Sequence, residues 1–542
     1  MALGIIIVVE SAKQPLKMNI KRTHLLALAI LLPCVLFSQE FIQGRVLDSV
    51  SKAPVVFANI LLEGSSKGVR SNEDGSFRIP MEFKSEYKGI IVSSLGYESV
   101  SVAMDALSED RINTIYLIPR TIALQETTVV GYTNRSLAKR IVRKAIRAIP
   151  RNFSKDPFSL VGYYRDYQQD ERTYLNLNES IVEVRDEGFH KSDAKTTKYQ
   201  IYRLVKNMDF PRDSISSMSY DYENQNKVIA QGFLPSYNGN ELVILRVHDA
   251  VRNYDIDSYS FVNNLRRDFV HNHDFQMGSD VYLDGEWLYS VLFDTYKENV
   301  RAKGRIIISK TDYSIYGLDY AAYEWNKKKE GSEPSNEDSS RMIFHIQSEY
   351  RPYQGKMFLN YLSFSNRFVV RLPPAFMLKN ITIDTNNKIT WLEFNNPVNI
   401  SSTLDKEHYE VFFRKKKLAF ELLKGHEEED KVFIRPIFTS EKDEIAYFSN
   451  DREALKKRMV YKVKGLMDVY GNMLGHSEQK EYLQYREFFT QRILQGNDGA
   501  ENGVPMDKER PLFDHVVTDE SVEAVQDYWM NTPLQEANDP PE

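Results

Sequence analysis

The stretch SNEDGSFRI, residues 71–79, places two acids, an amide and a glycine directly ahead of a strand-like alternation. Such a stretch is either a cation-binding loop or a turn between strands. In an EF-hand loop, oxygen ligands occupy positions one, three and five before a glycine at six, so Gly75 would make Arg70 a ligand. A guanidinium has no acceptor. We therefore expect a tight turn, in which Asp74 caps its own backbone and Gly75 takes a positive φ.

Short strand-like segments with turn signals surround this turn over residues 41–120. Among them are FIQGRVLD (41–48), VVFANILLEG (55–64), GIIVSSLGY (89–97) and INTIYLIP (112–119). Strands of this length at close, regular spacing favour an antiparallel β-sandwich of about 80 residues.

Six motifs of this region occur in a recognisable order. They are GRVLD (44–48), PVVFANI (54–60), Gly68-Val69, EDGSF (73–77), LGY (95–97) and IYL (115–117). In order and spacing they resemble the carboxypeptidase regulatory-like domain of many Gram-negative envelope proteins. The resemblance implies a seven-stranded transthyretin-like β-sandwich. Residues 124–130 resemble the segment that commonly follows this module, and residues 121–134 are expected to be a linker.

A secretory signal peptide is predicted over residues 1–38, with Met18 as a second candidate start. Two basic residues precede an apolar run over residues 25–37, which is too short to span a bilayer comfortably, and a small Ser38 follows. Cleavage removes Cys34, the only cysteine, so the exported chain is expected to be thiol-free. A lipoprotein box at Cys34 is the alternative, which the preceding proline disfavours. No transmembrane segment is expected in the mature chain.

Length and charge narrow the class of protein further. The 542 residues suit three or four domains. The formal net charge is -6, and the Lys and Arg residues are dispersed among Asp and Glu. Since nucleic-acid binding requires a basic surplus or a basic patch, no nucleic-acid partner is expected.

An uncharacterised α+β domain with a large antiparallel sheet is predicted over residues 135–372. In residues 135–153, apolar side chains recur at helical spacing, basic residues cover the other face, and a stop is expected at Pro150. Such a helix covers a sheet with its basic face in solvent, and contact of that face with anionic lipid is the alternative.

The strands after this helix carry two further resemblances. Residues 157–166 and 174–189 resemble an uncharacterised family with a Gly-Phe-Tyr-Arg-Glu signature, from which this chain departs at Tyr163 and Asp166. That resemblance implies no activity. The long alternating segments over residues 287–370 are similar in pattern to the curved sheets of envelope lipoprotein carriers, which can wrap around a helix or an apolar ligand.

His271, His273 and Asp274 are the candidate metal ligands of the middle region. Alternate histidines on a strand face one side and can pair on a metal. The pattern H-x-H-x-D-H is not completed, so a polar turn is preferred and no metal or other cofactor is expected. The G-x-S-x-G match at residues 64–68 joins two strands and indicates a hairpin loop rather than a nucleophile elbow. The H-x-x-E match at residues 426–429 lies in an acidic run and indicates a solvated turn.

The C-terminal third shows a further composition change. Residues 374–478 resemble the bacterial Ig-like domain, through a strand ending in Pro397-Val398 and a closing strand before Asp468 and Asn472, which are expected to serve a turn. Residues 479–542 are expected to be an irregular acidic tail.

The expected fold class is therefore mainly β and multidomain. The favoured function is an exported, non-enzymatic cell-envelope protein with a binding or scaffold role in the periplasm, at the outer membrane or outside the cell. An envelope protein, a glycan or a lipid is its expected partner. The alternative is a metal-dependent hydrolase with His271, His273 and Asp274 in its site.

Overall fold

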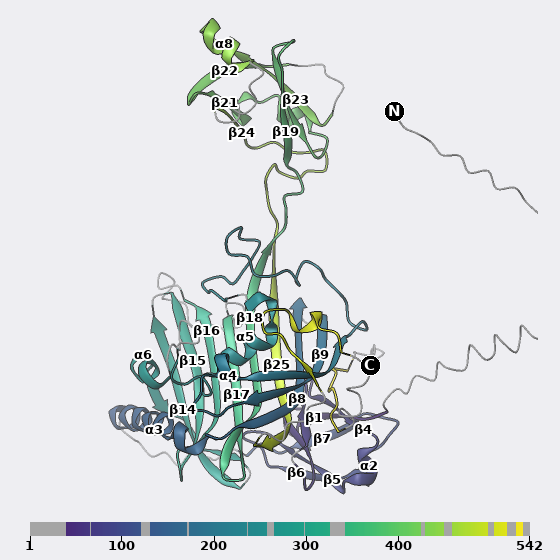
Figure 1. Cartoon of the computed structure of the whole chain (residues 1–542), viewed down its shortest axis with the longest axis vertical. Coiled ribbons are helices and arrows are strands. Elements are labelled where there is room, and N and C mark those ends of the chain that lie inside the picture. The colour runs from purple at the N-terminus through teal and green to yellow at the C-terminus, as the bar shows by residue number, and fades with distance from the viewer. Residues whose placement is uncertain are drawn as a thin grey trace, which may run out of the picture.

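The structure is a computed structural model, and it is mainly β and multidomain, as the sequence predicts. It describes residues 40–534 except 66, 121–130, 171–172, 236, 257–264, 284, 298, 326–341, 424–428, 449–457, 497–502 and 518–526. The predicted signal peptide, Cys34 and the segment 124–130 lie outside the described residues. A small sandwich packs on a large sheet, and a separate β module stands away from both on two long strands (Figure 1). Among the described residues, no helix has the length and apolarity needed to cross a membrane.

The N-terminal sandwich has one three-stranded and one four-stranded sheet, with orders β4-β1-β7 and β3-β2-β5-β6. Its buried core includes Val46, Phe77 and Ile90. The elements are β1 (Phe41–Asp48), β2 (Asn59–Leu62), β3 (Gly68–Arg70), β4 (Ser76–Pro80), α2 (Phe83–Glu86), β5 (Gly89–Ser93), β6 (Val100–Ala103), η2 (Met104–Ala106) and β7 (Asn113–Leu117).

The predicted turn at Asp74-Gly75 is confirmed. Gly75 has φ +76°, and its N–H donates to the Asn72 carbonyl at 2.9 Å. The Asp74 carboxylate accepts from the Ser76 N–H at 2.9 Å. An ideal Cβ on Gly75 would lie 2.5 Å from the Val46 carbonyl oxygen, so this position favours glycine for both conformation and space.

The large sheet has thirteen strands and runs β12-β14-β15-β16-β17-β18-β25-β8-β9-β10-β26, with β11 paired to β18 and β13 to β14. Its strands are β8 (Phe158–Asp170), β9 (Thr173–Asp186), β10 (Lys198–Lys206), β11 (Lys227–Val228), β12 (Phe275–Met277), β13 (Val281–Leu283), β14 (Glu286–Lys297), β15 (Val300–Ser309), β16 (Ile315–Glu324), β17 (Met342–Tyr353), β18 (Lys356–Arg371), β25 (Gln479–Gln495) and β26 (Val504–Pro505).

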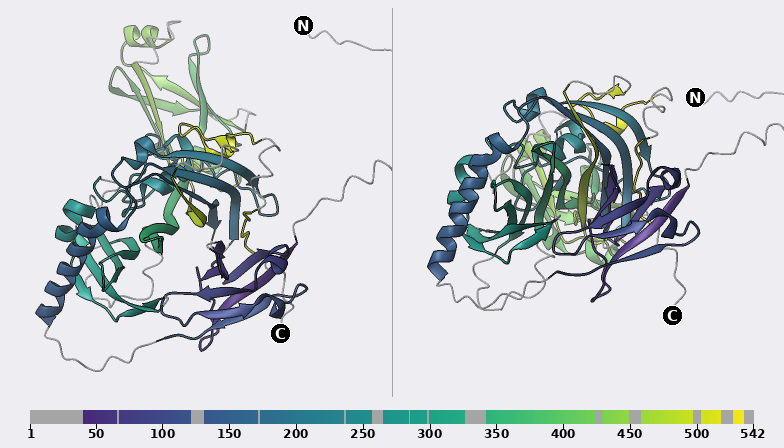
Figure 2. Two further views of the ribbon diagram at one scale, coloured as in Figure 1. Left: turned by 60° about the horizontal axis from the view of Figure 1, so that its bottom comes forward. Right: turned by 90° about the horizontal axis from the view of Figure 1, so that it is seen from below.

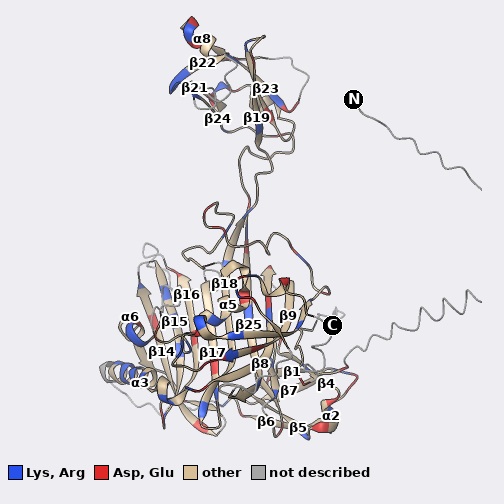
Figure 3. Ribbon diagram, in the orientation of Figure 1, with Lys and Arg blue, Asp and Glu red and all other residues tan. Residues whose placement is uncertain are grey.

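One face of this sheet, here called the helix face, packs against helices in the largest core of the molecule. The helices are α3 (Gly131–Asn152), α4 (Asp193–Thr196), η3 (Tyr237–Gly239), α5 (Glu241–Val247), η4 (Leu265–Phe269), α6 (Val270–Asn272) and η8 (Leu512–Asp514). The helix α3 buries Ile141, Val142 and Ile149 and carries Lys and Arg but no Asp or Glu (Figure 3). It begins inside the predicted linker and runs two residues past Pro150, whose missing N–H affects only the last turn.

The N-terminal sandwich docks on the opposite face of the sheet, here called the sandwich face (Figure 2). Neighbouring residues of a strand point to opposite faces. Accordingly, Tyr164 on β8 joins the core of the helix face, while Arg165 donates through Nη1 to Oδ1 of Asn72 at 2.6 Å. Gln169, four residues further, donates to the carboxylate of Glu73 at 3.1 Å. The stretch 71–79 is therefore a turn that also docks its domain onto the sheet.

The distal module over residues 376–475 has six strands in the hydrogen-bonded order β19-β20-β23-β22-β21-β24. Its Ig-like family stays a prediction. The Asp468 carboxylate accepts from the Asn472 N–H at 2.8 Å, which confirms the predicted turn. The elements are β19 (Leu378–Asp384), β20 (Ile389–Phe394), α7 (Ile400–Thr403), η7 (Lys406–His408), β21 (Tyr409–Phe413), β22 (Lys416–Leu422), β23 (Lys431–Ile437), α8 (Glu441–Tyr447) and β24 (Met459–Val463).

The expectation of an irregular tail from residue 479 is wrong for residues 479–495. They form β25, which pairs with both β18 and β8 in the middle of the large sheet. The module over residues 376–475 is thus an insertion between two neighbouring strands. Because these strands are far apart in sequence, no local pattern marks their pairing.

Candidate functional site

A polar cavity of about 180 Å³ lies between the helix face of the sheet and the segments that cover it. Strands β8, β9 and β25 form its wall, and β11, η3, the first residue of α5 and η8 cover it. The polar side chains of its lining are Asp166, Gln168, Asn176, Asn178, Ser217, Ser219, Tyr220, Lys227, Glu241 and Gln484.

Lys227 is the buried cation of this cavity, with 2% of its surface exposed. Its Nζ lies 4.8 Å from the ring centroid of Tyr220 and 4.0 Å from that of Phe368. The same atom donates to the Ser216 carbonyl at 2.7 Å. Burial lowers the pKa of Lys227 from 10.5 to about 7, because a buried ammonium loses its hydration. The charge of Lys227 therefore changes near neutral pH.

Asp166 is the buried carboxyl of the same cavity. Burial raises its pKa to about 7, and the negative charge of Glu241 adds to this rise. Its two oxygens accept from the Asn178 amide at 2.9 Å and from the Tyr164 hydroxyl at 3.0 Å. These two donors hold the carboxyl in one orientation.

Arg486 carries a second buried positive charge beside the cavity, on the strand next to Asp166. It donates through Nε to the Glu241 carboxylate and through Nη1 to Oδ1 of Asn366 at 2.8 Å. The Asn366 amide in turn donates to the Tyr220 hydroxyl at 2.8 Å. The guanidinium lies 5.0 Å from the ring centroid of Phe364. One hydrogen-bonded network thus joins α5, β18 and β25 to a tyrosine of the cavity lining.

The amides of the cavity wall also hold one another. The Gln168 amide donates to Oε1 of Gln484 at 2.7 Å, and the Asn176 amide donates to Oε1 of Gln168 at 2.7 Å. Two cationic side chains, Lys227 and Arg486, stand against two carboxyls in this region, so the charge is nearly balanced. A preorganised, charge-balanced polar wall suits a small ligand with several hydrogen-bonding groups.

The space between α3 and the sheet is different in character. It is lined by apolar side chains alone, among them Val142, Ile146 and Leu318, and its volume is about 10 Å³. A space of this size holds roughly one water molecule. The helix face therefore offers a polar cavity, while the space under α3 is filled by side chains.

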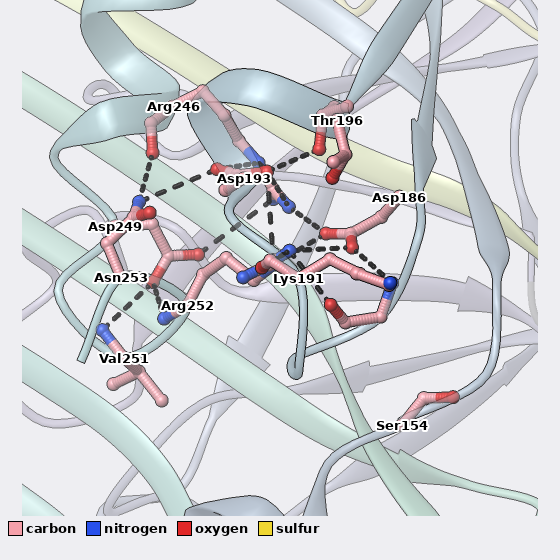
Figure 4. Close-up of polar contacts among 12 residues, drawn as sticks. Ser154, Asp186, Lys191, Asp193, Thr196, Arg246, Asp249, Val251, Arg252 and Asn253 are labelled. Carbon is pink, nitrogen blue, oxygen red and sulfur yellow. Dashed lines mark hydrogen bonds and ion pairs between the residues drawn. The ribbon is translucent and has the colours of Figure 1, made fainter. Parts of the chain in front are cut away.

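A buried ion cluster next to the cavity fixes α5 on the sheet (Figure 4). Arg252 binds Asp186 with two hydrogen bonds, of 2.7 and 2.9 Å. Arg246 of α5 binds the same carboxylate at 2.5 Å and lies 3.0 Å from Asp193. These bonds tie the ends of β9, α4 and α5 together. Since Glu241 is the first residue of α5, the cluster positions a carboxylate of the cavity.

Asp249 belongs to the same cluster and has a different environment. Burial raises its pKa, and its Oδ1 accepts from the Tyr350 hydroxyl. Its Oδ2 lies 4.0 Å from a nitrogen of Arg246. Three carboxyl groups and two guanidiniums share this buried site, which leaves one negative charge unbalanced. The raised pKa of Asp249 favours its protonation, which removes that charge.

The structure separates the three candidate metal ligands of the sequence. His273 is buried, its Nδ1 lies 2.9 Å from the Phe269 carbonyl, and its Nε2 lies 2.9 Å from the Tyr320 hydroxyl. Burial lowers its pKa to about 4. His271 lies in the middle of the three-residue helix α6 and is exposed, and so is Asp274. Both ring nitrogens of His273 are engaged in the core, so the three residues do not converge on one point.

The other two motif matches have different outcomes. The strands β2 and β3, which flank the match at residues 64–68, pair antiparallel, and Gly68 is the first residue of β3. The Ser65 hydroxyl donates to the Leu62 carbonyl at 3.1 Å, while Ser66 lies outside the described residues. The predicted hairpin loop is confirmed. His426 lies outside the described residues. Within the described parts of the chain, no three His, Cys, Asp or Glu side chains are grouped as a metal site.

Sequence reasoning missed Lys227, Arg486 and Glu241 as members of a site. One signal was present, since Arg165-Asp166 and Arg486-Glu487 are charged pairs inside otherwise apolar or aromatic strands. On a strand, such a pair sends one charge to each face. If both faces of the sheet are buried, the two charges need polar partners on both faces, so such a pair indicates a buried polar site on each.

The N-terminal module matches a known family. Residues 42–130 match the CarboxypepD_reg-like domain, which confirms the family that the motifs of this region indicate. The match covers the sandwich and none of the large sheet. No curated protein matches the chain.

Three solved structures are similar to parts of the chain. A putative outer membrane lipoprotein-sorting protein domain from Vibrio parahaemolyticus is 9% identical, covering 42% of this chain and 86% of its own, with a TM-score of 0.20. A DUF1329 family protein from Desulfovibrio piger is 10% identical, covering 59% and 99%, with a TM-score of 0.20. A LolA superfamily protein from Nitrosomonas europaea is 13% identical, covering 42% and 85%, with a TM-score of 0.17. Similarity at this level carries no argument about function.

Proposed function

We propose that this chain is an exported, non-enzymatic protein of the cell envelope that binds a small hydroxyl-rich ligand, a glycan residue, in the cavity of the helix face. The single observation that carries this proposal is the 180 Å³ cavity lined mainly by polar side chains, with Lys227 and Asp166 buried beside it. Export rests on the predicted signal peptide over residues 1–38, and the N-terminal module belongs to a type common in envelope proteins.

A glycan fits this lining better than a lipid for two reasons. Amides, hydroxyls and balanced charges match a neutral ligand with many donors and acceptors, whereas an acyl chain requires apolar walls. The apolar space under α3 is too small for an acyl chain, at about 10 Å³. Tyr220 and Phe513 of the lining add aromatic surface, which suits the apolar face of a sugar ring.

Binding fits the site better than catalysis because its charged groups are held by the protein. Asp166 accepts two hydrogen bonds and Lys227 donates one to a backbone carbonyl. Groups held in this way can orient a ligand, but their bonds to the protein hinder proton transfer to that ligand.

The test is calorimetric titration of the full chain with neutral monosaccharides and oligosaccharides, acidic sugars and phospholipid. We expect neutral sugars to bind, and Lys227→Met to weaken that binding at least tenfold. The matched control is Lys303→Met, an exposed lysine of β15 in the same sheet, which should leave the affinity unchanged. Binding of phospholipid without any sugar would contradict the proposal.

A further inference from the structure

A short C-terminal segment, residues 527–534, lies between the N-terminal sandwich and the sandwich face of the sheet. It has no regular secondary structure of its own. Trp529 at its centre is a member of the sandwich core and has 1% of its surface exposed. Its ring lies 5.3 Å from that of Phe83, and its indole N–H donates to the Arg78 carbonyl at 2.8 Å. A tryptophan more than 400 residues away in sequence thus completes the core of the first domain.

The large sheet forms hydrogen bonds with the backbone of the same tryptophan. The Gln491 amide of β25 donates to the Trp529 carbonyl at 2.7 Å. Its Oε1 accepts from the Trp529 N–H at 3.3 Å. One buried side-chain amide therefore binds both backbone groups of one residue, as a neighbouring strand would.

Asn531 joins the segment to two strands of the sandwich. Its Oδ1 accepts from the Arg78 N–H at 2.7 Å, and its Nδ2 donates to the Arg70 carbonyl at 2.7 Å. The next residue, Thr532, donates to the Glu179 carboxylate of the sheet at 2.8 Å. Without the segment, these backbone and side-chain groups would lose their partners inside the molecule.

A second space lies between the sandwich and the sheet, at residues other than those of the segment. A cavity of about 160 Å³ is lined from the sandwich by residues such as Phe57 and Asn59, and from the sheet by residues such as Glu349 and Asn360. Among the described residues, Nη2 of Arg165 has no hydrogen-bond partner, although Arg165 is fully buried. The interface between the two domains therefore holds a separate cavity, and Arg165, whose Nη1 donates to the Asn531 carbonyl at 3.5 Å, keeps unused hydrogen-bonding capacity beside the segment.

We propose that this interface is a recognition cleft for an extended peptide, and that residues 527–534 of this chain occupy it in cis. The cleft selects a large aromatic side chain at the position of Trp529 and an asparagine two residues later. The sheet bonds the peptide backbone at the tryptophan, and the asparagine side chain bonds the backbone of the sandwich. The bound peptide therefore holds the two domains together. This inference is independent of the proposed glycan site, which lies on the opposite face of the sheet.

The test separates the peptide from the cleft. A chain ending at residue 526 is titrated with the synthetic peptide DYWMNTPL, residues 527–534. We expect one peptide to bind per chain and to raise the melting temperature of the shortened protein toward that of the full chain. Peptides with Trp529→Ala or Asn531→Ala should bind at least tenfold more weakly. The control peptide with Asp527→Asn should bind within threefold, because Asp527 is 53% exposed in its ion pairs with Lys67 and Arg492.

A second measurement covers the case in which the shortened chain does not fold. The full chain with Trp529→Ala should bind the added wild-type peptide, whereas the wild-type chain should not, because its cleft is filled. The proposal is overturned if the shortened chain stays folded and binds no peptide. It is also overturned if the Trp529→Ala peptide binds as tightly as the wild-type peptide.

Discussion

Replacement of Lys227 by methionine should stabilise the protein at low pH and destabilise it at high pH. The pKa of Lys227 falls from 10.5 to about 7 on folding, a shift that corresponds to roughly 5 kcal/mol of cost for the charged form. Below pH 7 the lysine is charged in both states, so the folded state bears this full cost. Between pH 7 and 10.5 unfolding takes up a proton, so the free energy of unfolding rises with pH.

Methionine removes the charge and keeps the apolar contact with Tyr220 and Phe368. It also leaves the Ser216 carbonyl without the 2.7 Å hydrogen bond, at a cost of about 1 to 3 kcal/mol. The expected net effect at pH 6 is thus a stabilisation of about 2 to 4 kcal/mol. At pH 10 the cost of the charge has almost vanished, so only the loss of the hydrogen bond remains and the variant is less stable than wild type.

The assay is urea unfolding of both proteins at pH 6, 8 and 10, followed by circular dichroism, with the exposed Lys303→Met as control. Titration of ¹³C-methylated lysines by NMR gives the pKa of Lys227 directly. A difference in stability between variant and wild type that stays constant from pH 6 to pH 10 would refute the buried-charge argument.

Two further predictions concern the sandwich and its docking. Arg165→Met should lower the free energy of unfolding in urea by about 3 to 5 kcal/mol, because it leaves the carboxylate of Glu487, 2.6 Å away, buried and unpaired. Adding Glu487→Gln should recover most of this loss. A double variant as unstable as Arg165→Met would contradict the argument. Gly75→Ala should lower the melting temperature of the sandwich more than Asp74→Ala, since a positive φ costs alanine about 1 to 2 kcal/mol and the lost side-chain hydrogen bond about 0.5 to 1.5 kcal/mol. Calcium should shift neither melting curve, and a calcium-dependent rise abolished by Asp74→Ala would show a cation site.

The local features of the chain were predictable because short-range patterns encode them. The turn at Asp74-Gly75 follows from two residue types, and the helix α3 follows from the apolar spacing between Leu137 and Ile149. Leu137 shares the apolar spacing of that helix and is nevertheless exposed, which shows the limit of such patterns. A spacing rule marks a helical face, and the width of the contacting surface decides which residues at its edge are covered.

The candidate site was not predictable in the same way. Lys227 lies on a two-residue strand. Arg486 lies in residues 479–542, which were expected from their composition to be an irregular tail. Their proximity depends on β25 pairing with β18 and β8, and on β11 pairing with β18. Neither pairing leaves a local signal, because the residues that meet are separated by long stretches of chain.

The sequence by itself thus determined the sandwich family, the export signal as a prediction, the mainly β class and the amphipathic helix α3. Only the tertiary structure decided which charges became buried. Arg165 and Asp166 are neighbours in sequence, yet one joins the sandwich and the other joins the polar cavity, because a strand sends adjacent side chains to opposite faces. Whether each face is covered, and by which distant segment, depends on the burial of apolar surface over the whole chain, which no short window of sequence contains.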